Sequence, residues 1–215
     1  MHRRRRTALT VSVALLVAAP LLAACGNEAH PGAAAVVGGE RIEVSTVQAE
    51  AEDVRTAQER SPQAAQLIKG SGQLSRAKLY DMIVAEVVQR AADDASVTVS
   101  RKEIQDERAA LVQQSGGEEQ LAAMYLEQGV TPDQLNDIAR RNVMVSKLAA
   151  SLGATNTPEG QQKLNDAFIA AAKSLKIDVN PRFGTWDDRK LVLGDYKAPW
   201  IAQVTEEQQP VESGA

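Results

Sequence analysis

The sequence opens with a basic segment followed by an apolar one, an order that is not typical of the start of a folded domain. Four arginines at residues 3–6 precede an apolar run from Ala8 to Ala24. A basic start followed by a short apolar core is the order of a secretory signal. The run is shorter than the roughly 20 apolar residues that span a bilayer, and no later stretch approaches that length. We therefore expect residues 1–24 to be a signal peptide, and we expect no transmembrane segment.

The apolar run ends in Leu-Ala-Ala-Cys-Gly at residues 22–26, which resembles the lipobox of bacterial lipoproteins. Cys25 is the only cysteine of the chain. A lone thiol in an exported protein can instead form an intermolecular disulfide or a reactive site, but its place directly after an apolar signal favours lipidation. The resemblance implies cleavage before Cys25 and attachment of a diacylglycerol to its sulfur. Two acyl chains, at roughly 0.8 kcal/mol per CH2, anchor a protein stably.

The expected location is therefore extracytoplasmic, with the protein lipid-anchored to the bacterial cell membrane. Arg5 and Arg6 before Thr7 leave both the general secretory and the twin-arginine export routes open. Residues 25–215 carry 20 basic and 28 acidic side chains, a formal net charge of −8. An acidic protein is a poor partner for nucleic acid or for anionic lipid, so the membrane contact must come from the anchor.

The composition of the chain and the positions of its glycines and prolines predict one domain between two unstructured segments. Residues 25–34 are small, polar and rich in Gly and Pro, which is typical of a lipidated tether. We expect a single domain over residues 35–200 and a disordered polar tail over residues 201–215. The lack of a second cysteine excludes a core cross-linked by disulfides.

The domain is expected to begin with a strand at residues 36–37, a Gly-Gly turn and a second extended piece at residues 41–44. Ser45 with Gln48 three residues later is a capping-box pattern that predicts the start of a helix. Residues 61–73, with their proline and glycines, are expected to form a loop containing at most one helical turn.

The strongest predicted helix covers residues 75–92, where apolar side chains recur every four residues. Its stripe consists of Leu79, Ile83, Val87 and Ala91, and is widened by Met82 and Val88. Ser100 with Glu103 forms a second capping-box pattern, and the helix that it opens is expected to end at Gly116 and Gly117. A short helix through Leu121, Met124 and Tyr125 is expected to stop at Gly129, and further helices are expected from Thr131 and Thr157, each of which is followed by proline.

After residue 175 the pattern changes to that of a short strand at residues 177–179, followed by an Asn-Pro break. The closing segment holds four of the seven aromatic residues of the chain: Phe183, Trp186, Tyr196 and Trp200. Since aromatic side chains bury large areas, we expect this segment to pack onto the helices. Two short strands at opposite ends of a chain are not stable alone, so we expect them to pair with each other.

The order of these elements resembles the chaperone core of the SurA family and the related PrsA foldases. The resemblance covers about residues 34–190 and lies in the Gly-Gly turn, the long helix at residues 75–92, Val-Thr-Val-Ser-x-x-Glu at 97–103, Gly-Val-Thr-Pro-Asp-Gln-Leu at 129–135, and Asn-Pro-Arg-Phe-Gly-Thr-Trp at 180–186. It implies a mostly α fold, a helical chaperone-core domain with a small β element that pairs the N-terminal and C-terminal strands.

The sequence departs from that family in one respect. A parvulin prolyl-isomerase domain of about 100 residues commonly interrupts the family's core, whereas residues 153–176 leave room for a loop and one helix only. The two histidines of the chain, His2 and His30, lie in the signal and the tether and cannot supply a parvulin site. The resemblance therefore implies client binding without isomerase activity.

Flexible and aromatic side chains are suited to weak binding of many unfolded chains. For methionine and aromatic side chains, packing in the core is a commoner role than client binding. For the one arginine among the candidates, Arg182, a solvated position in a turn is the commoner role. The candidates for client binding are Met82, Met124, Tyr125, Met144, Arg182, Phe183 and Trp186.

We find no catalytic constellation, no cofactor motif and no metal site. Adjacent carboxylates such as Glu118 with Glu119 usually point to different faces, and without a histidine in the domain a serine has no ordinary base. The sequence thus predicts a non-enzymatic, membrane-anchored holdase for unfolded or exported polypeptides, with no nucleic-acid partner and no small-molecule substrate. An adaptor lipoprotein with one dedicated envelope partner is the alternative, and a solute-binding lipoprotein is a more distant one.

Overall fold

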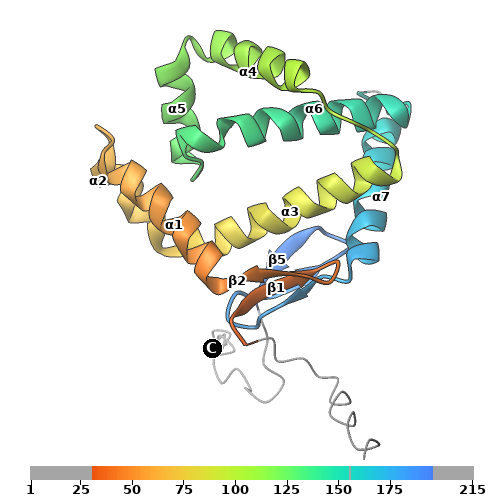
Figure 1. Cartoon of the computed structure of the whole chain (residues 1–215), viewed down its shortest axis with the longest axis horizontal. Helices are drawn as coiled ribbons and strands as arrows, with labels where there is room; N and C mark the ends of the chain where they lie inside the picture. Colours follow the sequence, from red (N-terminus) through yellow and green to blue (C-terminus); the bar gives the residue numbers. More distant parts are fainter. Residues whose placement is uncertain (1–30, 155, 196–215) are drawn as a thin grey trace, which may run out of the picture. The chain divides into compact units, whose positions relative to one another are not determined.

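A computed structural model describes residues 31–154 and 156–195 of the chain. Its compact unit starts at Gly32 and is mostly helical, with small antiparallel strand pairs, as the sequence predicts (Figure 1). The signal peptide, Cys25, Tyr196, Trp200 and the predicted tail lie outside the described residues. The helices are α1 (Val44–Glu59), α2 (Ala64–Leu67), α3 (Leu74–Asp94), α4 (Arg101–Ser115), α5 (Glu118–Glu127), α6 (Leu135–Ser151) and α7 (Pro158–Leu175), with 3-10 turns η1 (Ile68–Gln73) and η2 (Pro132–Gln134).

The first and the closing strand meet, which confirms the pairing expected from the sequence. β1 (Ala33–Val37) lies between β2 (Glu40–Glu43) and β3 (Asp178–Val179), antiparallel to both. The register places Ala35 opposite Val179. β1 begins within the range predicted as tether, because Ala33 and Ala34 are buried at 2% and 0% exposure. Their small side chains fit beneath the helices, and the first strand starts three residues earlier than expected.

The turn between β1 and β2 is the Gly-Gly turn of the sequence, and its first glycine contacts the end of α7. Gly38 has φ of +62°, a conformation that other residues rarely adopt. Its N–H donates to the carbonyl of Leu175 over 2.7 Å. A Cβ atom at Gly38 would lie 2.9 Å from Leu175 Cδ2. The turn therefore fixes the strands against the C-terminal end of α7.

α3 is the central helix of the unit, as its four-residue repeat predicts. Leu79 and Ile83 are fully buried at 0% exposure. They share one core with β1, β3 and α7, and Leu148 of α6 completes it. Within the described part of residues 153–176, α7 is the sole regular element, and it packs along α3.

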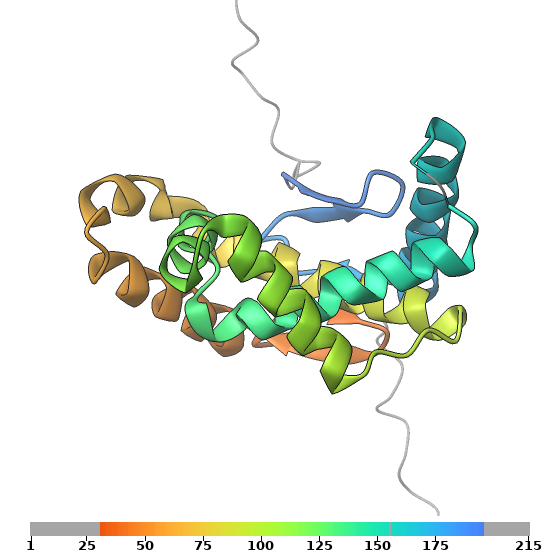
Figure 2. The same cartoon turned by 90° about the horizontal axis from the view of Figure 1, so that it is seen from above.

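A second hairpin, which the sequence analysis missed, follows β3. β4 (Thr185–Asp187) pairs with β5 (Val192–Gly194). Seen from above, this hairpin lies on one side of α3, and β1 and β2 lie on the other (Figure 2). Arg76 of α3 donates to the carbonyl of Leu193 over 2.8 Å. The rings of Tyr80 and Trp186 have centroids 6.2 Å apart, and Phe183 also packs against the main core. The described part of the closing segment thus packs onto the helices as expected.

Of the two capping boxes predicted, one forms and one does not. Ser100 caps α4, with its hydroxyl accepting from the Glu103 N–H over 3.3 Å. A helix does begin where Ser45 predicts one, since α1 starts at Val44, but the predicted cap is wrong, because Glu43 is the N-cap and no side chain caps the helix. β2 runs directly into α1, and the Val44 N–H donates to the carbonyl of Gly32 over 2.8 Å. The carbonyl of Gly32, which directly precedes β1, therefore accepts from one of the first N–H groups of α1, which have no partner within the helix.

Residues 61–73 are more helical than the loop with one helical turn that we expected, because α2 runs directly into η1 and the two cover Ala64 to Gln73. Thr157 caps α7, its hydroxyl accepting from the Gly160 N–H over 3.1 Å. No helix within the described residues is both long enough and apolar enough to span a bilayer.

Candidate binding groove

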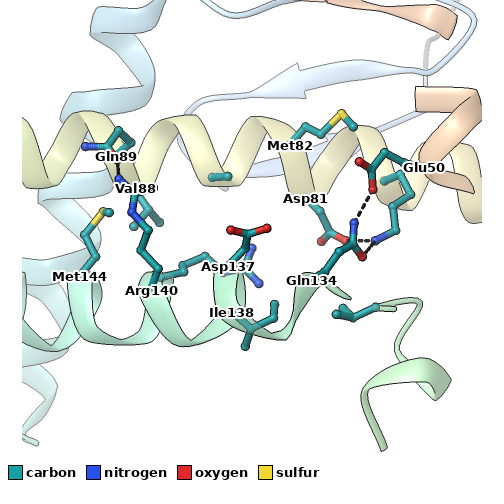
Figure 3. A pocket seen from close by; sticks show the side chains of 14 residues that line it. Glu50, Asp81, Met82, Val88, Gln89, Gln134, Asp137, Ile138, Arg140 and Met144 are labelled. Atoms are coloured by element: carbon teal, nitrogen blue, oxygen red, sulfur yellow. Dashed lines mark hydrogen bonds and ion pairs between the residues drawn. The ribbon is translucent and has the colours of Figure 1, made fainter. Parts of the chain in front are cut away.

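α3 and α6 run side by side, and α4 lies on the far side of α6 (Figure 1). A groove lies between α3 and α6 (Figure 3). It encloses a cavity of about 260 Å³. Glu50 of α1, Gln134 of η2 and Val130 complete the lining of the groove. The lining residues are Glu50, Lys78, Asp81, Met82, Ala85, Val88, Gln89, Val130, Gln134, Asp137, Ile138, Arg140, Arg141 and Met144.

One end of the groove is apolar and closed by packing. Val88 of α3 and Met144 of α6 belong to a small core cluster together with Ala92, and Met144 is only 4% exposed. Ala85 and Met82 continue the lining along α3 toward the other end, although the Met82 side chain points away from α6 (Figure 3) and also packs against the main core. The side chains therefore offer an aliphatic and thioether surface rather than an aromatic one.

The opposite end is polar and joins three elements. Lys78 of α3 donates to Gln134 Oε1 over 3.2 Å, and the Gln134 amide nitrogen donates to the Glu50 carboxylate of α1 (Figure 3). The Thr131 N–H also donates to Gln134 Oε1, over 3.2 Å. Lys78 is 4% exposed, and the carboxylate of Asp81 lies 3.7 Å from its ammonium. This end is thus bridged by a partly buried hydrogen-bond network around the buried Lys78.

The charges along the groove balance, with three acidic and three basic side chains in its lining. Burial raises the pKa of Asp81, while the charges of Lys78 and Arg141 act in the opposite direction. Arg140 donates to Gln89 Oε1 over 2.7 Å across the groove. A neutral rim with an apolar floor does not select strongly for the charge of a ligand.

α6 is held from behind by polar contacts with α4. Lys147 donates to Glu103 over 2.6 Å, and Asn142 donates to Glu107 over 3.1 Å. Hydrogen bonds from Lys147, and from the backbone and side chain of Ser100, lower the pKa of Glu103 to about 2. The same carboxylate therefore caps α4 and ties it to α6, which positions the second wall of the groove.

The structure brings two of the seven predicted client-binding residues to the groove, Met82 and Met144. Met124, 41% exposed, and Tyr125 lie on α5 and do not line it. The other three belong to the closing segment: Phe183 and Trp186 pack against the main core, and Arg182 is exposed in the turn after β3.

Sequence reasoning did not identify the polar end of the groove. Lys78 precedes Met82 by four residues and so lies on the flank of the apolar stripe of α3, which is the one signal that the sequence offers. A lysine at the edge of an apolar stripe is commonly solvated, and nothing local indicates that Glu50 and Gln134 approach it.

The side chains of the groove are of the kinds that bind a ligand. Among residues 31–154 and 156–195, no group of three or more His, Cys, Asp or Glu side chains is placed to hold a metal ion. The walls instead combine apolar contact with a few hydrogen-bonding groups, which is the usual make-up of a ligand groove.

Comparison with known families identifies the chain. The sequence model of a family described as the SurA-like N-terminal domain matches residues 1–149. That range runs through the groove walls α3 and most of α6. Searches of curated proteins and of solved structures found no match. The chain therefore belongs to the SurA-like N-terminal domain family, a family of chaperone type.

Proposed function

We propose that the protein is a membrane-anchored extracytoplasmic holdase that binds unfolded or newly exported polypeptides without isomerising their prolyl bonds. Its family supports the chaperone type, and the signal and lipobox of the sequence support the anchor on Cys25. The observation that carries the proposal is the groove between α3 and α6, with an apolar wall and balanced charges.

The size of the groove fits weak and exchangeable binding. A cavity of about 260 Å³ accepts the apolar side chains of a short segment rather than a folded surface. Burying one Leu-sized side chain contributes roughly 1.5–3 kcal/mol, whereas a dissociation constant of about 1 mM already requires roughly 4 kcal/mol. A client must therefore add contacts outside the cavity, and each segment can leave quickly. Met82 and Met144 can adjust to side chains of different shape.

The first experiment measures suppression of aggregation. Protein that begins at Gly26 retains the whole compact unit from Gly32 and is added in increasing ratio to a denatured client while light scattering is recorded. Suppression of scattering without activity in a parallel prolyl-isomerisation assay is the expected result. Absence of suppression at several-fold excess over two or three unrelated clients would reject the holdase and favour an adaptor for one dedicated partner.

A matched pair of variants tests the groove itself. Ala85→Arg places a large charged side chain at an exposed position of the groove wall, where Asp81 one turn earlier can support it. Ala109→Arg makes the same change at an exposed position of α4 outside the groove. We expect Ala85→Arg to lose most of the suppression and Ala109→Arg to keep it. Equal activity of the two variants would place client binding elsewhere.

The anchor is tested separately with the full chain. Replacing Cys25 by alanine removes the sulfur that the lipobox resemblance assigns to lipid. We expect the variant to leave the membrane fraction of cells that express it, while the unaltered chain stays there and incorporates labelled fatty acid. Retention of the variant in the membrane fraction would refute anchoring through this residue.

A further inference from the structure

The polar end of the groove holds a side-chain amide between a donor and an acceptor. Gln134 Oε1 accepts a hydrogen bond from Lys78 Nζ over 3.2 Å, and its Nε2 donates to the carboxylate of Glu50. Figure 3 shows the Gln134 side chain directed toward Glu50 of α1. Lys78 lies on α3, and Gln134 is the last residue of η2, directly before α6.

A glutamine side chain offers the same groups as a peptide bond, a carbonyl acceptor and an N–H donor. An ammonium paired with a carboxylate at this spacing is therefore complementary to any main-chain amide. Such a pair does not distinguish one client side chain from another, because every peptide group other than that of proline presents the same carbonyl oxygen and N–H. A site of this kind would give affinity for a polypeptide without selecting its sequence.

We propose that in the free protein the Gln134 amide occupies a site for a main-chain amide of a client. In the complex, the carbonyl of a client peptide group accepts from Lys78, and its N–H donates to Glu50. The inference rests on the proposed function and names its ligand as the main chain of an extended polypeptide. Along such a segment successive side chains point to opposite faces. One side chain can then enter the apolar part of the groove while the adjacent peptide group occupies the polar end.

The burial of Lys78 supports an exchange of one amide for another. Its ammonium carries three donors and is 4% exposed, with Gln134 as its close acceptor and the Asp81 carboxylate 3.7 Å away. Withdrawing Gln134 without a replacement would leave a buried charge poorly bonded, which is costly. A client carbonyl at the same place can accept from Lys78 and from the Thr131 N–H, which also donates to Gln134 Oε1 over 3.2 Å, so Gln134 acts as an internal competitor that weakens binding and speeds release.

The competition predicts a gain of affinity when Gln134 is removed. Gln134→Ala should tighten binding of a fluorescent unfolded peptide roughly three- to tenfold, the range that one net hydrogen bond represents, whereas Lys78→Met should weaken it. Gln162→Ala removes an exposed glutamine of α7 that donates to Asp166 over 2.7 Å, and should leave affinity unchanged. Fluorescence anisotropy with protein from Gly26 onward measures all three, after circular dichroism has shown that each is folded.

A second measurement uses unaltered protein, so that it remains decisive if Gln134→Ala does not fold. Peptides in which a single amide is replaced by an ester lack one N–H donor. We expect one ester position to weaken binding to the unaltered protein, and Glu50→Ala to abolish that difference. Equal binding of all ester peptides, or weaker binding by folded Gln134→Ala, would overturn the inference. Failure of the unaltered protein to bind any unfolded peptide would instead refute the proposed function, and the inference with it.

Discussion

The helices α3 and α4 lie on opposite sides of α6 and are stabilised in different ways. α3 buries eight of its side chains, among them Leu79 and Ile83 at 0% exposure. α4 is fully described, and none of its side chains is fully buried. Its contacts with the rest of the unit include the ion pair of Glu103 with Lys147 and the hydrogen bond of Glu107 with Asn142.

The difference shows where the stability of the fold resides and where its geometry can be adjusted. Burial of apolar side chains is the largest favourable contribution to folding, so the core around α3 should carry most of the free energy of unfolding. Exposed and half-buried ion pairs contribute little each. α4 therefore acts chiefly to set the position of α6, the wall of the groove opposite α3.

The largest expected effect compares the same truncation on the two helices. Leu79→Ala removes a fully buried side chain of α3 and should lower the free energy of unfolding by about 3 kcal/mol. Leu111→Ala removes a half-buried side chain of α4 and should cost about 1 kcal/mol. Urea denaturation of both variants measures the two values. Equal losses would mean that α4 is as much a part of the core as α3.

A smaller effect on stability is expected when Ser100, which caps a helix, is compared with Ser45, which does not. Ser100→Ala removes the hydroxyl that accepts from the Glu103 N–H and should cost about 1 kcal/mol. Ser45→Ala removes a hydroxyl that caps nothing and should change stability by less than about 0.5 kcal/mol. If the two substitutions cost the same in urea denaturation, the cap of α4 would not be what stabilises it.

The smallest effect is a pH dependence of the contact between α4 and α6. The pKa of Glu103 is about 2 in the folded protein, below the usual 4.5, chiefly because of its hydrogen bond from Lys147. The carboxylate therefore adds stability that is complete above pH 4.5 and is lost as the pH falls toward 2. We expect Glu103→Gln to be less stable than the unaltered protein at pH 7, and the gap to close across that window.

Lys147→Met provides the matching variant, because it removes the donor that contributes most to the lowered pKa of Glu103. Its deficit in thermal unfolding should shrink over the same interval of pH. A gap between Glu103→Gln and the unaltered protein that stays constant from pH 7 to pH 2 would contradict the role assigned to this carboxylate.

Sequence patterns predicted the elements whose causes are local. The four-residue repeat of Leu79, Ile83, Val87 and Ala91 predicted α3 because a helix places such positions on one face. Ser100 was correctly predicted as a cap, since the pattern needs only residues three apart. The hairpin of β4 and β5 was missed because strands of three residues each are too short to show an alternation.

The sequence by itself determined the composition of the core, the main helices, the expected pairing of the first and closing strands, and the resemblance that the family match bears out. Only the tertiary structure decided that Glu50, Lys78 and Gln134, which lie on three different elements, meet at one end of a groove. It also decided that Ser45 does not cap α1, whose first N–H donates to the carbonyl of Gly32. Caps and periodicity act within one or two turns of chain, whereas a polar site between helices depends on how those helices pack.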